Sequence, residues 1–96
     1  MSNETYNGWT NYETWRVNLE MLDGMTLDDM GLHLTEEDDR DEITEQLAEA
    51  LEAHCVEIVE HDARGFALNL AQSFLARVDW EEIAEHMVSD YEAEVA

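Results

Sequence analysis

Carboxylates are the chemical groups that dominate this sequence, and they are densest in the stretch TEEDDRDEITEQLAEALEAH. Six of the seven residues from Glu36 to Glu42 are acidic. On a helix, carboxylates four residues apart are separated by about 6 Å along the axis. Successive phosphates of a nucleic-acid strand have a similar spacing, roughly 6–7 Å. The pattern therefore predicts a phosphate-like surface for a groove lined with Arg and Lys. The candidate partner-binding residues are Glu36, Glu37, Asp38, Asp39, Asp41, Glu42, Glu45, Glu49 and Glu52.

Residue patterns that would indicate catalysis are absent from the sequence. Glu57 and His61 share a helix face at a spacing of four, as do Glu82 and His86, but neither pair forms the H-E-x-x-H motif of zinc enzymes. There is no Gly-rich phosphate loop, and Ser73 falls within an expected helix rather than at a nucleophile elbow. We therefore expect a protein that is not an enzyme and that holds no cofactor and no metal.

The overall charge restricts the possible partners. The chain carries 25 Asp and Glu against four arginines and no lysine, a formal net charge of −21. Such a surface repels nucleic acid and anionic membranes and attracts basic protein surfaces. We expect the partner to be the basic surface of a nucleic-acid-binding protein, with no direct binding to nucleic acid or membrane.

Length and hydropathy predict one domain over residues 1–96. No apolar run approaches the roughly 20 residues of a membrane span, and the N-terminus lacks a signal-peptide pattern, so a cytoplasmic location is expected. The lone cysteine, Cys55, lies beside apolar residues on an expected helix, which favours a small buried thiol. Acidic neighbours would raise its pKa rather than lower it.

The hydrophobic periodicity predicts helices and no strands. We expect helices over about residues 11–22, from after residue 35 to about 62, over 66–78 and from 80 onward, with one short turn near 26–31. Three caps are predicted: Thr10 with Glu13, Thr35 with Asp38, and Asp79 with Glu82. The fold class is therefore all-α, a compact single-domain array of four main helices plus a short helical turn.

Each expected helix has an apolar face that should form the core. In the first helix the face is Tyr12, Trp15, Leu19 and Leu22, and in the long helix it is Ile43, Leu47, Ala50, Leu51, His54 and Ile58. The next helix offers Phe66, Ala67, Leu70, Ala71, Phe74 and Val78, and the last offers Trp80, Ile83, Ala84, Met87, Val88 and Tyr91. Trp9 precedes the first cap, where a hydrophobic staple packs, and whether Tyr6 and Trp9 also serve an interface is left open.

Two stretches, GWTNYETW near the start and RVDWEEIAEHM near the end, carry a resemblance to known sequences. The chain resembles a family of small uncharacterised proteins of phages and mobile elements, with an NYETW-type N-terminal motif and a VDWxEIAEH-type C-terminal motif. The resemblance brings no catalytic residues. It implies a gene of phage or mobile-element character, a setting in which small acidic proteins often disarm host defence.

Two main functions remain open at this stage. One is an inhibitor of host defence, of anti-CRISPR or anti-restriction type, in which the acidic run imitates nucleic acid. The other is a structural or interaction protein of a salt-adapted organism or its virus, because acids are spread along the whole chain. A metal-binding regulator that uses His54 and His61 is a third, weaker hypothesis. The chain is expected to be a monomer or a dimer.

Overall fold

The regular structure is helical throughout the part of the chain that the computed structural model describes, residues 5–35 and 37–95, apart from an isolated bridge between Tyr6 and Trp9. This confirms the predicted all-α fold with four main helices and a short turn. The helices are α1 (Tyr12–Met21), the 3₁₀ turn η1 (Asp28–Met30), α2 (Arg40–Asp62), α3 (Gly65–Leu75) and α4 (Trp80–Val95).

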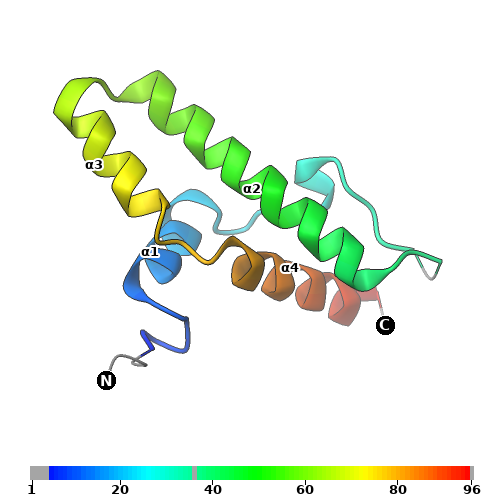
Figure 1. Cartoon of the computed structure of the whole chain (residues 1–96). Helices are drawn as coiled ribbons and strands as arrows, with labels where there is room; N and C mark the ends of the chain where they lie inside the picture. The colour runs from blue at the N-terminus through cyan, green and yellow to red at the C-terminus, as the bar shows by residue number, and fades with distance from the viewer. Residues whose placement is uncertain (1–4, 36, 96) are drawn as a thin grey trace.

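Helix α2 is the longest element, about 35 Å at 1.5 Å per residue, and the other helices are arranged on it. Figure 1 shows α4 lying along its N-terminal half and α3 folding back beside its C-terminal half. Helix α1 contacts both α3 and α4. The radius of gyration is 14.2 Å, above the ~12.5 Å of a compact domain of this length. The α2–α3 end therefore extends beyond the main core.

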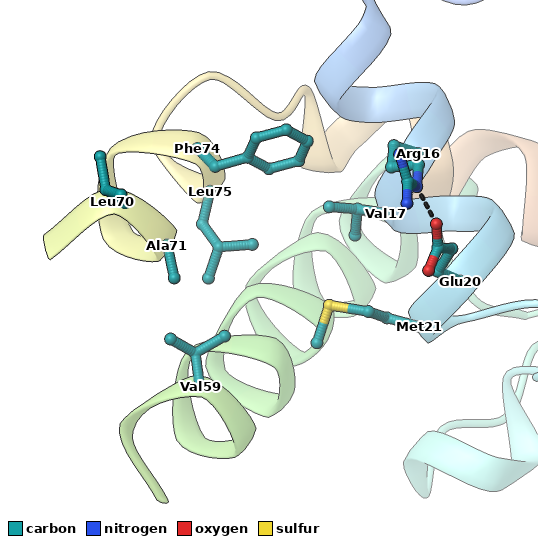
Figure 2. A pocket seen from close by; sticks show the side chains of 9 residues that line it. All are labelled: Arg16, Val17, Glu20, Met21, Val59, Leu70, Ala71, Phe74 and Leu75. Carbon is teal, nitrogen blue, oxygen red and sulfur yellow. Dashed lines mark hydrogen bonds and ion pairs between the residues drawn. The ribbon is translucent and has the colours of Figure 1, made fainter. Parts of the chain in front are cut away.

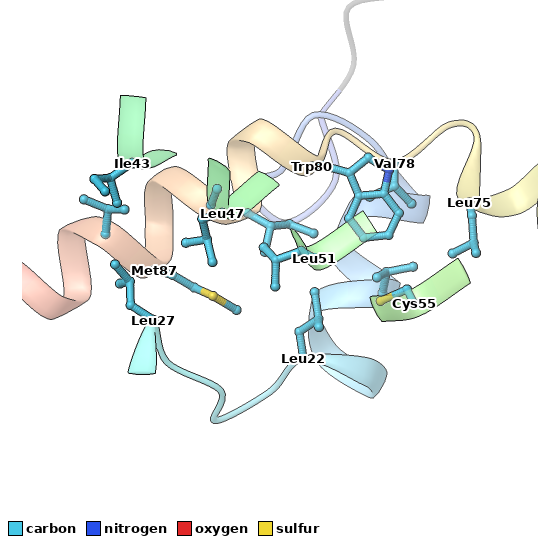
Figure 3. Packing of buried hydrophobic residues seen from close by; sticks show 14 residues of the cluster. Leu22, Leu27, Ile43, Leu47, Leu51, Cys55, Leu75, Val78, Trp80 and Met87 are labelled. Carbon is cyan, nitrogen blue, oxygen red and sulfur yellow. The ribbon is translucent and has the colours of Figure 1, made fainter. Parts of the chain in front are cut away.

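The core lies between α2 and α4, closed by residues of α1 and of the η1 loop. Figure 3 shows Leu47 and Leu51 of α2 packed among Leu22, Leu27 and Met87. The face predicted for the last helix is confirmed, since five of its six members are buried and Tyr91 is half-buried. The buried apolar residues are Val17, Leu22, Leu27, Ile43, Leu47, Leu51, Cys55, Leu75, Val78, Trp80, Ile83, Ala84, Met87 and Val88.

The face predicted for the first helix is wrong except at its end. Tyr12 and Leu19 are 37% and 48% exposed, whereas Thr14 and Val17 are buried. The helix is rotated because Thr14, a small polar residue, accepts a hydrogen bond from the start of α4 and so has to face the core. A pattern read from apolar residues alone assigns the opposite side of α1 to the interior.

The face predicted for the long helix is correct in its first half. Ile43, Leu47 and Leu51 are buried, but Ile58 is 37% exposed. The buried side continues instead through Cys55 to the half-buried Val59, in steps of four residues. The difference arises because α4 covers only the N-terminal half of α2, so the last turns of α2 pack on the much shorter α3 (Figure 1).

Candidate functional site

The acidic row on α2 is the helical part of the site predicted from the sequence. We use this name for Asp41, Glu42, Glu45, Glu49 and Glu52, all of which are exposed. At 100° per residue these five positions fall within a sector of about 100° around the helix axis. Successive members along one edge are about 6 Å apart in axial rise, as the phosphate comparison requires. No arginine or histidine of α2 falls in this sector.

The acids before the row have a different local structure from the one predicted. The helix begins at Arg40, with Asp39 as its N-cap, and not directly after Thr35. The backbone N–H and the hydroxyl of Thr35 donate to Asp38 Oδ2 at 2.8 and 3.0 Å, so the predicted pair forms a tight turn that precedes the helix. The Asp39 carboxylate accepts from the Asp41 N–H at 3.0 Å.

These contacts divide the nine predicted partner-binding residues into two groups. Asp38 and Asp39 each have one carboxylate oxygen engaged by the backbone, so they fix the start of α2 as well as adding charge. Glu37 is exposed in the same turn, and Glu36 lies outside the described residues. The structure places the other five together on the regular helix as the acidic row.

Among the described residues, three of the four arginines form ion pairs. Arg16 pairs with Glu20 one turn along α1. Arg40 Nε lies 3.1 Å from the Glu92 carboxylate on α4, and Arg77 Nε lies 2.9 Å from that of Glu13. The Arg40 and Arg77 pairs link segments far apart in the sequence, and none of these ion pairs includes a member of the acidic row. The row therefore keeps a negative field, which solvent ions screen.

The two sequence motifs meet in space and form a polar clamp between α1 and the start of α4. Asn11, not Thr10, caps α1: its side-chain oxygen accepts from the Thr14 N–H at 2.9 Å, and its amide donates to the Arg77 carbonyl at 2.8 Å. The Thr14 hydroxyl accepts from the Asp79 N–H at 2.8 Å. The predicted Thr10–Glu13 box is thus wrong. The motif residues have a structural role here.

The third predicted cap is correct in one half. The Glu82 N–H donates to Asp79 Oδ1 at 3.1 Å, so Asp79 caps α4 as predicted. The Glu82 carboxylate does not return to that cap, because it accepts from the Thr10 N–H at 2.9 Å. This contact links the segment before α1 to α4 and extends the polar clamp.

The aromatic residues of the opening motif fall into two groups. Tyr6, Tyr12 and Trp15 form a cluster with centroid separations of 4.9–5.8 Å, and Tyr12 also meets Phe74 of α3 edge-on. Trp9 is separate and stacks on His86 of α4 at 4.2 Å. The rings thus join the N-terminal segment to both later helices. Tyr6 and Tyr12 remain partly accessible at the surface.

The cysteine and two of the histidines lie on α2 in different environments. Cys55 is buried, as predicted, and burial raises the pKa of its thiol from 9.0 to about 11. The cause is desolvation and not the neighbouring acids that the sequence suggested. His54 is half-buried, and His61 contacts Asp62 at 3.0 Å. Within residues 5–35 and 37–95, no three His, Cys, Asp or Glu side chains are grouped as a metal site requires.

An apolar groove between α1 and α3 was missed from the sequence. The groove has a volume of about 450 Å³. Figure 2 shows the residues around it: Val17 and Met21 on α1, Leu70 and Phe74 on α3 and Val59 on α2, with the Arg16–Glu20 ion pair on the α1 side. We call it the α1–α3 groove.

The apolar side predicted for α3 is wrong in its first half and correct in its second. Phe66 and Leu70 are 75% and 55% exposed and Ala67 is exposed, whereas Ala71 and Phe74 are half-buried and Val78 is buried. The first half is exposed because α3, at the far end of α2, packs there by one edge alone. The missed signal was compositional: residues 63–78 contain no acid, and we call them the acid-free segment.

Comparison with known proteins gives a family but no function. No helix in the described part of the chain is long and apolar enough to cross a bilayer. No curated protein and no solved structure shows significant similarity to the chain. One family model matches residues 2–95, which is nearly the whole sequence. The chain therefore belongs to DUF7249, a family of unknown function.

Proposed function

We propose that this protein is a non-enzymatic inhibitor of host defence, of anti-CRISPR or anti-restriction type, made by a phage or mobile element and acting in the host cytoplasm. It occupies a basic nucleic-acid-binding surface of a defence protein. The observation that carries the proposal is the acidic row, five exposed carboxylates in one sector of a regular helix with no base among them. The resemblance of the two terminal motifs to phage proteins supports the biological setting.

The mechanism follows from the rigidity of α2. Carboxylates on a folded helix are held in place before binding, so the row loses little conformational freedom when an Arg- or Lys-lined groove closes on it. Each contact is a charge-assisted hydrogen bond of the kind that such a groove makes with phosphate. The net charge of −21 also steers a basic partner toward the protein and accelerates the encounter.

A second candidate is a salt-adapted interaction protein without mimicry. The observation that favours it is the exposure of acids on α4 as well, at Glu81, Glu85, Asp90 and Glu94. A protein of this kind needs salt to fold, because counter-ions relieve repulsion among its carboxylates. Melting measured by circular dichroism from about 20 mM to 2 M salt separates the two candidates. Full helicity at 20 mM salt argues against the second.

The test of the first candidate is capture from a host lysate at about 100 mM and 500 mM salt, where the Debye length shrinks from roughly 10 to 4 Å. A supporting result is capture of a nucleic-acid-binding protein that is lost at high salt and displaced by added DNA or RNA. Capture that survives 500 mM salt and excess nucleic acid would exclude mimicry.

Charge reversal on two faces gives a matched comparison. One variant changes Glu45, Glu49 and Glu52 to lysine, and its control changes Glu85, Asp90 and Glu94 on α4. Both sets are exposed and change the net charge equally. We expect the first to abolish capture and the control to retain it. Equal loss in both would show that net charge, not the acidic row, binds the partner. Asp38 stays unchanged because it closes the turn with Thr35.

A further inference from the structure

The acid-free segment is an exception on this molecule. It spans 16 of the 96 residues and its only charges are Arg64 and Arg77, a formal +2, whereas the remaining chain carries −23. Its outer side is also apolar, with Phe66 and Leu70 largely exposed. Burial within the chain does not explain the lack of acids, since Asn69, Gln72 and Ser73 on the same helix are exposed and uncharged.

We propose that the α3 face and the α1–α3 groove form the contact between two copies of this chain. The charge distribution selects the occupant. A basic partner would gain from acids at the edge of its contact, so a face built for it should be acidic like the rest of the surface. A second copy carries −21 itself. Two such chains approach at least cost through α3, which has no carboxylate, and through a groove whose one lining carboxylate, Glu20, is paired with Arg16.

The shape of the face also suits a symmetric pair. A two-fold contact uses the same patch on both chains, so that patch has to hold both a projection and a recess. Leu70 lines the groove, and Phe66 lies one turn before it on the same side of α3. Phe66 therefore projects beside the groove, where a two-fold axis can place it against the groove of the other copy. This inference stands independently of the proposed inhibitory function.

The expected contact is weak and strengthens with salt. Helix α3 has 11 residues and is about 16 Å long, so the interface lies at the small end of the range for specific complexes. We expect a dissociation constant in the micromolar range. Added salt screens the repulsion between two chains of −21, so association should tighten from about 50 mM to 1 M salt. Binding of the acidic row to a basic surface should change in the opposite direction.

The test is sedimentation velocity on the whole chain from about 5 to 300 μM, at 50 mM and 1 M salt. We expect a dimer whose fraction increases with protein concentration and with salt. Phe66→Glu and Leu70→Glu should each raise its dissociation constant by about tenfold or more. Leu19→Glu is the matched control. It adds the same charge at an exposed leucine of α1 that does not line the groove, and it should leave the dimer intact.

Two results would overturn the proposal. One is a monomer at every concentration and salt. The other is a dimer that both α3 variants leave unchanged, or that Leu19→Glu weakens equally. Circular dichroism keeps the variants interpretable, because Phe66 and Leu70 are mostly exposed and either substitution should retain the helical signal. If one variant fails to fold, the other still decides the outcome.

Discussion

Helices α2 and α3 are consecutive in the chain and pack on each other, yet they present opposite surfaces to water (Figure 1). Helix α2 carries the acidic row, and α3 carries no acid at all. A general need for hydration would place carboxylates on the exposed side of both helices. The contrast therefore indicates that the two faces are under different requirements: α2 keeps charge in the open, and α3 excludes it from a surface that is to be covered.

Ionic strength should affect the two surfaces in opposite directions. From about 50 to 500 mM salt, binding of the acidic row to its basic partner should weaken at least about a hundredfold, because several charge contacts are lost together. Self-association through α3 should strengthen over the same range. Binding isotherms with the captured partner and sedimentation of the chain alone measure the two trends. Parallel trends would mean that one surface serves both contacts.

The polar clamp offers the next largest effect. Thr14→Val keeps the shape of the side chain but removes its hydroxyl. The Asp79 N–H then loses its acceptor, and Asn11 Oδ1 loses a donor. We expect a loss of about 2–3 kcal/mol in the free energy of unfolding, the cost of unsatisfied groups at a largely buried position. Urea titration measures it. Thr10→Val, which removes only the long, exposed 3.4 Å contact from the Thr10 hydroxyl to Asp79 Oδ2, is the control and should cost less than about 0.5 kcal/mol.

Loss of the polar clamp should also affect α2 and α3 differently. It ties α1 to the turn that follows α3, so its loss should loosen the wall of the α1–α3 groove more than the acidic row. Hydrogen exchange should therefore accelerate in α1 and α3 and stay close to the native rate in the first half of α2. Uniform acceleration across all helices would show that the clamp acts on global stability alone.

Sequence reasoning recovered the elements of this fold because each has a strong local signal. The face of α4 was predicted in full, since Trp80, Ile83 and Met87 follow the helical period and all of them reach the core. The acids of α2 were placed on the exposed side of that helix for the same reason. Both inferences use only neighbours three or four positions away.

The errors share a different cause, which is dependence on distant residues. Thr14 faces the core because of Asp79, 65 positions later, and no local pattern contains that contact. Phe66 is exposed because α3 lies beyond the reach of α4, which depends on the length of α2. The α1–α3 groove likewise needs three helices at once. The acid-free segment could have been noticed from composition, and it was the one sequence signal of the second site.

Alkaline pH should destabilise the fold through Cys55, which lies on the buried side of α2. Burial raises the pKa of the Cys55 thiol to about 11, above its ordinary 9.0, so the folded chain keeps the proton longer than the unfolded chain. The stabilisation is complete below pH 9 and falls as pH rises to 11, by about 2 kcal/mol. Urea titrations across this range should show the decline in the native chain. Cys55→Ala should lack that part of the decline. An identical decline in Cys55→Ala would show that the thiol is not its cause.

The smallest expected effect comes from making the same glutamine-to-glutamate substitution once on α2 and once on α3. Gln46 and Gln72 are both exposed helix residues. A glutamate at 46 would lie one turn from Glu42 and Glu49, whereas a glutamate at 72 would have no acid three or four positions away. Like charges at these spacings each cost about 0.2–0.5 kcal/mol. We therefore expect Gln46→Glu to destabilise the monomer by about 0.5–1 kcal/mol at low salt and Gln72→Glu to change it by less than half of that. The difference should disappear at 1 M salt.

If Gln72→Glu proves as costly as Gln46→Glu, the repulsion is a property of the whole molecule, and the lack of acids on α3 then reflects the stability of that helix rather than a contact.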